Sequence, residues 1–262
     1  MKTRLDAELV RRGLARSREH AADLIESRSV IVRGIPASKP ATQVDAETSI
    51  ILQGDRDDFV SRGGHKLAGA LDAFKDIVVE GKKCLDAGAS TGGFTDVLLR
   101  RGAAQIVAVD VGYGQMAWEL RQDPRVVILD RTNIRHLTSE MVGEPVDLVV
   151  ADLSFISLTL VLPALAAVSK PDADFVLMVK PQFEVGREKL GAGGVVRDVG
   201  LRRSSVLDVA GSALELGLGT MGIAASPLPG PAGNVEYFLW LRWGADHIDE
   251  EAVDRAIAEG PQ

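Results

Sequence analysis

The feature that most constrains the fold of this chain is a regular alternation of strand-like and helix-like segments between residues 64 and 243. Short apolar runs rich in β-branched residues alternate with segments whose apolar residues recur at helical spacing. We expect strands over 84–87, 106–110, 126–129, 147–151 and 175–179, and helices over 65–74, 93–101, 158–168 and 202–216. This alternation predicts a mostly parallel α/β sheet with helices on both faces. Two final strands, near 222–225 and 235–243, have no helix between them and are expected to add an antiparallel hairpin, which makes seven strands.

The first 54 residues have a different pattern and predict a separate small module. Helical spacing covers 4–12 and 17–26, and short strands are expected at 30–32 and 50–52. A polar segment follows. We therefore expect an α+β domain over 1–54, a linker over 55–63, a larger α/β domain over 64–244 and an acidic tail over 245–262.

Composition excludes several classes of protein. The 262 residues are 46% hydrophobic and 26% charged, as in ordinary folded proteins. The single cysteine, Cys84, cannot form an internal disulfide, and with four scattered histidines no zinc-site spacing exists, so no metal is expected. No secretory leader opens the sequence, and we expect a cytoplasmic protein.

One window, 148–168, is long enough to span a bilayer. It contains Asp152 and Pro163, and a buried strand followed by a helix explains it better. We expect no membrane partner.

The net charge of −7 argues at first against a polyanionic partner. The charge is uneven, however. Residues 1–33 carry eight Lys/Arg against five Asp/Glu, whereas 245–262 carry six acids against Arg255 alone. The amino-terminal module is therefore the part suited to nucleic acid.

A glycine-rich turn over 86–95 joins the first expected strand of the sheet to a helix. Such turns let the backbone approach a ligand at the carboxyl ends of parallel strands. No Gly-Lys-Ser/Thr follows, and the glycine spacing is not G-x-G-x-x-G, so the turn does not fit a P-loop or a dinucleotide fingerprint.

Acidic residues end the first three strands of the expected sheet. Asp86 would repel a pyrophosphate but suits a cation, Asp110 is placed for ribose hydroxyls, and Asp130 for an adenine amino group. S-adenosylmethionine (SAM) combines these features, so we expect a Rossmann-like SAM methyltransferase. The expected SAM residues are Asp86, Gly88, Ser90, Thr91, Gly92, Gly93, Phe94, Asp110, Asp130 and Asp152.

Methyl transfer needs an aligned nucleophile and the management of one proton. Four polar residues fall near the expected sheet mouth: Lys66, Asp152, Lys180 and Glu236. A nearby cation and partial burial would lower the pKa of Lys180. Glu236 lies in an otherwise apolar strand, and we expect it to have a basic partner.

These four residues, in this order, resemble the Lys-Asp-Lys-Glu set of the FtsJ-like ribose 2′-O-methyltransferases. The segments 60–67 (VSRGGHKL), 86–95 (DAGASTGGFT), 152–158 (DLSFISL) and 180–184 (KPQFE) extend the match. With the amino-terminal module, the chain resembles the TlyA (haemolysin A-like) family over residues 1–243.

The resemblance implies SAM-dependent 2′-O-methylation of cytidine in ribosomal RNA, 16S, 23S or both. It also implies roles. Lys180 would be the base or polariser of the 2′-hydroxyl, Lys66 and Glu236 would orient it, and Asp152 would position Lys180 and the methyl group.

The same resemblance makes the small module an S4 RNA-binding domain. This resemblance depends on 4–6 (RLD), 16–18 (RSR) and 30–34 (VIVRG). The sequence departs from the S4 pattern at Arg28 and Arg33, where a glycine and an asparagine are frequent in the family. Added cations there suit phosphate contact. We expect Arg4, Arg16, Arg18 and Lys39 to bind RNA, and Arg11 and Arg12 to form a solvated helix face.

Three other functions fit parts of the sequence. Residues 152–155 (DLSF) loosely resemble the loop of base N-methyltransferases, but its two prolines are absent. The second alternative is a membrane-active haemolysin. The third is an S4-type RNA-binding or assembly factor whose methyltransferase domain is inert.

Overall fold

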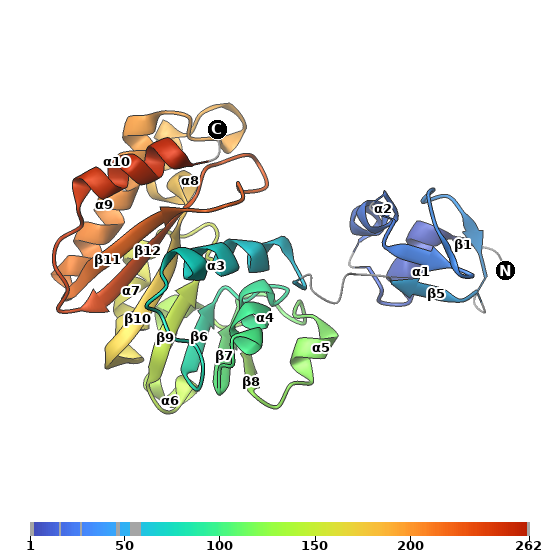
Figure 1. Ribbon diagram of the computed structural model, residues 1–262, viewed down its shortest axis with the longest axis horizontal. Coiled ribbons are helices and arrows are strands. Elements are labelled where there is room, and N and C mark those ends of the chain that lie inside the picture. Colours follow the sequence, from blue (N-terminus) through green and yellow to red (C-terminus); the bar gives the residue numbers. More distant parts are fainter. Residues whose placement is uncertain (1–2, 16, 27, 46–47, 53–58, 261–262) are drawn as a thin grey trace. The chain divides into compact units, whose positions relative to one another are not determined.

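The computed structural model describes residues 3–15, 17–26, 28–45, 48–52 and 59–260. The chain divides into two compact units, 1–58 and 59–262 (Figure 1). The division falls inside the segment expected as a linker, 55–63, of which residues 55–58 lie outside the described part. Residues 59–63 belong to the second unit, where the Val60 amide donates to Asp96 Oδ2 at 2.9 Å.

The first unit combines two helices with five very short strands. The helices are α1 (Leu5–Arg11) and α2 (Arg18–Glu26). Strands β1 (Thr3–Arg4) and β4 (Gln43–Val44) pair antiparallel, and β2 (Val30–Val32) lies between β3 (Ile35–Pro36) and β5 (Ile50–Leu52). The apolar residues that predicted the helices, including Leu5, Leu9, Ala21 and Ile25, form the core of this unit.

The two turns that flank β2 have a backbone conformation that L-residues rarely adopt. Arg28 has φ +60° and Arg33 has φ +53°. Glycine would tolerate this left-handed region better because it lacks the Cβ atom that costs about 1–2 kcal/mol there, and asparagine because its short side chain can hydrogen-bond locally. With arginine at both positions the turns still form, but their backbone is strained.

The second unit is built on a seven-stranded sheet. Its order is β11-β12-β10-β9-β6-β7-β8. The strands are β6 (Lys83–Ala87), β7 (Gln105–Val109), β8 (Val126–Leu129), β9 (Val146–Ala151), β10 (Ser169–Val179), β11 (Leu218–Ala225) and β12 (Tyr237–Trp243). Strands β6 to β10 are parallel to one another, and β12 is antiparallel to both β10 and β11. The expected parallel sheet with a closing antiparallel hairpin is confirmed.

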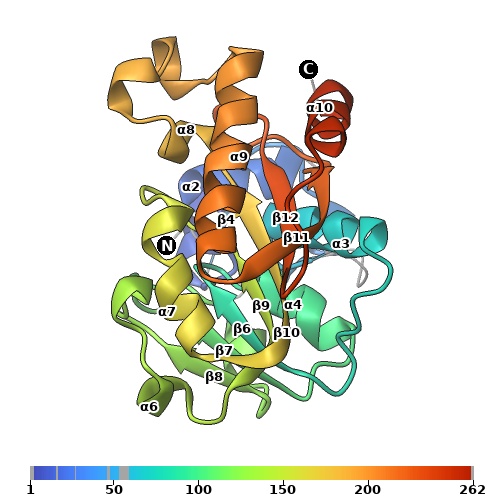
Figure 2. The ribbon, with the colours of Figure 1, turned by 90° about the vertical axis from the view of Figure 1, so that its left-hand side faces the viewer.

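Helices cover both faces of this sheet. Figure 2 shows α7 (Leu162–Ala167) and α9 (Val199–Glu215) on one side, and α3 (Arg62–Ala73) and α4 (Gly93–Arg100) on the other. Neighbouring residues of a strand alternate between the two cores, as Val149 and Val150 do in β9. Because both faces are buried, the strands are continuous apolar runs.

Shorter elements connect these layers. They are α5 (Trp118–Arg121), α6 (Ser139–Val142) and α8 (Pro181–Glu184), with 3-10 turns at Ile134–His136, Leu158–Leu160, Arg187–Lys189 and Ala192–Gly194. The apolar window 148–168 spans the end of β9, one such turn and α7. No helix within the described ranges is long and apolar enough to cross a membrane.

The acidic carboxyl-terminal segment differs from the tail that we expected. Residues Glu250–Glu259 form α10, which buries Val253, Ala256 and Ile257. Arg203 of α9 binds both Glu250 and Asp254. The acids lie near the amino end of α10, where the helix dipole favours negative charge. Much of this acidic excess therefore belongs to a packed helix.

Candidate active site

Two neighbouring cavities open at the carboxyl ends of the parallel strands. Their volumes are about 290 Å³ and about 510 Å³, and their walls share Gly88, Ser90, Asp152 and Ser154. The smaller one is also lined by Lys66 and Lys180. The sheet thus places a cationic cavity next to a larger one at the edge where open α/β sheets bind ligands.

Lys180 and Asp152 form an ion pair in the wall of the smaller cavity. Lys180 directly follows β10, and Asp152 directly follows the neighbouring strand β9. The distance from Lys180 Nζ to Asp152 Oδ1 is 2.6 Å, and Nζ also donates to Ser154 Oγ at 3.1 Å. The Lys180 side chain is only 10% exposed. The two strand ends therefore hold the ammonium group at one point of the wall.

Lys66 and Glu236 form a second and more deeply buried pair. Lys66 Nζ lies 2.6 Å from Glu236 Oε2, and Gln182 Nε2 donates to Oε1 at 3.2 Å. Glu236 is 1% exposed and immediately precedes β12 instead of lying within it. A Cβ atom at Gly230 would approach Glu236 Oε1 to 2.6 Å, so the carboxylate fills the space beside that glycine. The basic partner that we expected for Glu236 is Lys66.

The glycine-rich turn brings its backbone close to Asp152. Gly88 has φ +88°, and a Cβ atom there would lie 2.6 Å from the Asp152 carbonyl oxygen. Six of the predicted SAM residues line the smaller cavity: Gly88, Ser90, Thr91, Gly93, Phe94 and Asp152. Gly92 does not. It has φ +94° and packs against Leu120. Its role is to form the turn.

Of the three strand-end acids, the structure brings only Asp110 to a cavity. Asp110 lines the larger cavity, and its carboxylate accepts the amides of Ser90 at 2.8 Å and Gly112 at 2.6 Å. Asp130 lies outside both walls, with Gly114 N at 3.1 Å and Arg121 Nη1 at 3.7 Å from Oδ2. Asn133, which sequence reasoning missed, lines the larger cavity three residues further on.

Asp86, for which the sequence predicts a cation contact, is also outside both cavity walls. It is fully buried, and its Oδ2 accepts the Thr95 hydroxyl at 2.6 Å. Its Oδ1 has no partner among the described residues. Burial raises the pKa of Asp86 to about 7, and the Thr95 hydroxyl opposes this rise. Asp86 therefore acts on the turn through Thr95.

The short helix α8 connects this site to the loop after β9. Glu184 Oε1 accepts the Leu158 amide at 2.9 Å, and its Oε2 accepts the Ser157 hydroxyl. Burial raises the pKa of Glu184. Phe183 packs against Phe155, with ring centroids 5.1 Å apart. The sequence offered no signal for these contacts, because 157 and 184 are far apart in the chain.

Phe155 is 92% exposed and has φ +64°, although it lines the larger cavity. A large apolar side chain in this conformation is uncommon. The loop after β9 therefore holds an aromatic ring in solvent at the rim of the site.

The predicted RNA residues of the first unit lie mostly on its surface. Arg4 and Arg18 both bind Asp6, and Lys39 is exposed. Arg16 lies outside the described residues. Arg11 and Arg12, expected on a solvated helix face, are both bound to Glu8, and the Arg12 side chain is only 22% exposed.

Comparison with known proteins agrees with this geometry. The FtsJ-like methyltransferase model matches residues 59–243, and the S4 domain model matches residues 3–50. The 16S/23S rRNA (cytidine-2′-O)-methyltransferase TlyA of Mycobacterium tuberculosis is 62% identical over 99% of each chain. The chain belongs to the TlyA family of FtsJ-like methyltransferases.

Other TlyA relatives are more distant. The 23S rRNA (cytidine-2′-O)-methyltransferase TlyA of Campylobacter jejuni is 31% identical over 86% of this chain and 93% of its own. Hemolysin A of Brachyspira hyodysenteriae is 36% identical over 89% and 97%. A solved structure from Streptococcus thermophilus is 37% identical, covers 98% of this chain and 96% of its own, and has a TM-score of 0.75. Both units, and not the catalytic unit alone, are thus shared within the family.

Proposed function

We propose that this TlyA family member transfers a methyl group from SAM to the ribose 2′-oxygen of cytidine in ribosomal RNA. The observation that carries the proposal is the Lys180–Asp152 pair, which lies in the wall of one cavity with Lys66 and the glycine-rich turn. A cytoplasmic location goes with this substrate.

The residues of the larger cavity fit SAM by their chemistry. Among the described residues, its wall contains Asp110 and Asp152 and no lysine or arginine. Asp152 is paired with Lys180, so Asp110 contributes most of the negative charge of this wall, which disfavours a pyrophosphate and favours a sulfonium or an ammonium group. Asp110 and Asn133 offer acceptors for hydroxyl and amino groups, and Gly88 leaves room for a close ligand. When bound, SAM supplies an electrophilic methyl group.

The chain's own residues would manage the proton of the attacking hydroxyl. Lys180, held by Asp152 and Ser154, lines the cavity, where its ammonium form would polarise the hydroxyl and its neutral amine form would take the proton. Lys66 lies in the same wall, and its ion pair with buried Glu236 fixes where its charge sits. Positioned charges of this kind act strongly in a site that excludes water.

The names of the relatives support RNA as the substrate and leave the subunit to experiment. The Mycobacterium relative is named for 16S and 23S rRNA, and the Campylobacter relative for 23S rRNA alone. A match to the S4 domain over 3–50 supports an RNA-contacting first unit. Both ribosomal subunits are therefore substrates to test.

The test is methyl transfer from labelled SAM to purified 30S and 50S subunits, followed by mapping of the label to ribose or base. We expect ribose label on cytidine, a loss of about 10²–10⁴-fold in Lys180→Ala, and near-normal activity in Lys75→Ala, which removes an exposed lysine. Label on a base would support the N-methyltransferase alternative. No label on either subunit would support an inert RNA-binding factor.

A further inference from the structure

Helix α1 of the first unit contains two buried acids, and each acid forms ion pairs with two arginines. Asp6 is 4% exposed and Glu8 is 2% exposed. Buried carboxylates are costly unless they are paired. Arg4 and Arg18 pair with Asp6, whereas Arg11 and Arg12 pair with Glu8. These two clusters, the Asp6 cluster and the Glu8 cluster, differ in what their arginines can still reach.

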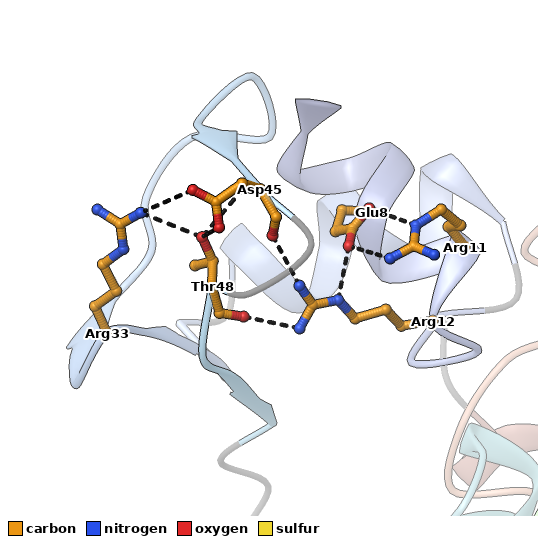
Figure 3. Close-up of polar contacts among 6 residues, drawn as sticks. All are labelled: Glu8, Arg11, Arg12, Arg33, Asp45 and Thr48. Atoms are coloured by element: carbon orange, nitrogen blue, oxygen red, sulfur yellow. Dashed lines mark hydrogen bonds and ion pairs between the residues drawn. The ribbon is translucent and has the colours of Figure 1, made fainter. Parts of the chain in front are cut away.

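The Glu8 cluster is engaged within the protein (Figure 3). Arg12 donates to Glu8 Oε1 at 2.8 Å, to the Thr48 carbonyl at 2.8 Å and to the Asp45 carbonyl at 3.0 Å. Arg33 donates to Thr48 Oγ1 at 3.2 Å. These contacts tie the end of α1 to the turn before β5. The Glu8 cluster therefore holds the unit together.

The Asp6 cluster is open to solvent. Arg4 donates through Nε to Asp6 Oδ1 at 3.1 Å and through Nη2 to Oδ2 at 2.9 Å, and Arg18 Nη2 donates to Oδ2 at 3.0 Å. The Arg4 and Arg18 side chains are 46% and 61% exposed, against 6% for Asp6. Their remaining guanidinium N–H groups have no protein acceptor recorded within the described ranges. The guanidinium groups of Arg4 and Arg18 thus share the buried Asp6 carboxylate and keep N–H donors for another acceptor.

We infer that Asp6 is a positioning residue, which holds Arg4 and Arg18 together as a two-armed site for a phosphate group of the RNA backbone. The inference rests on the proposed function for its RNA substrate. Guanidinium forks match phosphate oxygens in pairs. An arginine that is already ordered loses less side-chain entropy when it binds. The triad keeps a net charge of +1, so it still attracts a polyanion.

This inference makes a prediction opposite to that of simple charge counting. Asp6→Asn removes a negative charge from an RNA-binding surface, which by charge alone would tighten binding. We expect Asp6→Asn to weaken binding about fivefold to tenfold, because both arginines lose their anchor. The matched control is Asp23→Asn, which removes an exposed acid of α2 and should leave binding unchanged or slightly tighter.

The experiment measures equilibrium binding of the full chain to purified 30S and 50S subunits between about 50 and 200 mM salt. Binding of Asp6→Asn equal to or tighter than that of the wild type would overturn the inference. Because no methyl transfer is needed, this result is separate from failure of the Lys180 chemistry. A wild-type chain that binds neither subunit would overturn the inference together with the RNA substrate.

Further variants separate positioning from damage to the fold. In an Arg4→Gln/Arg18→Gln background, Asp6→Asn should cause no further loss of affinity, since its effect passes through these arginines. If Asp6→Asn unfolds the first unit, the Arg4→Lys/Arg18→Lys variant tests the inference instead. It keeps both charges and loses the forks, and we expect a similar loss of affinity. Full affinity in that variant would contradict the inference.

Discussion

Both units of this chain bury acids and pair them with cations, but they place the cations differently. In the first unit, Arg4 and Arg18 extend from Asp6 into solvent, 46% and 61% exposed. In the second unit, Lys66 and Lys180 are 9% and 10% exposed and line one cavity. An exposed cation attracts any nearby phosphate and is screened by salt, whereas a buried one acts on a single atom. Under the proposed function, the exposed arginines would hold RNA and the buried lysines would act in the transfer step.

The largest effect is expected from breaking the buried pair of the second unit. Glu236→Leu leaves Lys66 without its partner, and we expect a loss of about 3–5 kcal/mol in the free energy of unfolding. Adding Lys66→Met should recover much of that stability and none of the methyl transfer. Chemical denaturation and the methylation assay together check both statements. Recovery of activity in the double variant would show that the pair is only structural.

A second prediction concerns Asp86, whose pKa is raised to about 7 by burial. The unfolded chain releases this proton near pH 4, whereas the folded chain keeps it until about pH 7. The contribution of Asp86 to stability is therefore present below about pH 4 and lost as the pH rises to 7. Relative to the wild type, Asp86→Asn should gain up to about 4 kcal/mol across that range.

Denaturation of both proteins at several pH values between 4 and 8 checks this. A stability difference that stays constant with pH would contradict the burial argument.

The next effect is smaller and concerns Glu184, which binds the loop after β9. Glu184→Ala leaves the Leu158 amide and the Ser157 hydroxyl without their acceptor. We expect a loss of about 1–3 kcal/mol in stability and slower methyl transfer, because the loop after β9 carries Asp152. Glu184→Gln, which still offers one acceptor, should recover part of both. Equal behaviour of the two variants would argue against the hydrogen bonds as the cause.

The smallest effect is a gain in the first unit. Arg28→Gly relieves the left-handed φ of +60°, and we expect a stabilisation of about 0.5–1 kcal/mol. RNA binding measured alongside shows whether that arginine also contacts phosphate. A destabilised variant would mean that the arginine side chain contributes more than its backbone costs.

Much of the sheet and of the site follows from local sequence. Parallel strands are apolar on both faces and end where ligands bind, so Lys180 and Asp152 were predictable from their positions just after two strands. The partner of Glu236 was predictable in kind, because a carboxylate in an apolar strand needs a cation.

Other features depend on contacts that no local pattern encodes. Asp86 lies within β6, where its side chain is buried and accepts the hydroxyl of Thr95, nine residues later. Asp130 is absent from both cavity walls and contacts the Gly114 amide and Arg121, whereas Asn133 lines the larger cavity. Arg4 and Arg18 were expected on RNA, but the buried acid that joins them is visible only once α1 has folded against α2.

The proposal that the first unit binds RNA and the second transfers the methyl group is tested most directly by a single-turnover methylation assay. In this assay the chain is in saturating excess over ribosomal subunits. We predict that Lys180→Ala slows the transfer step by at least about 10²-fold with unchanged subunit affinity, whereas Arg18→Gln lowers affinity with an unchanged transfer rate at saturation. A Lys180→Ala chain that transfers at the wild-type rate, or an Arg18→Gln chain slowed at saturation, would contradict the account.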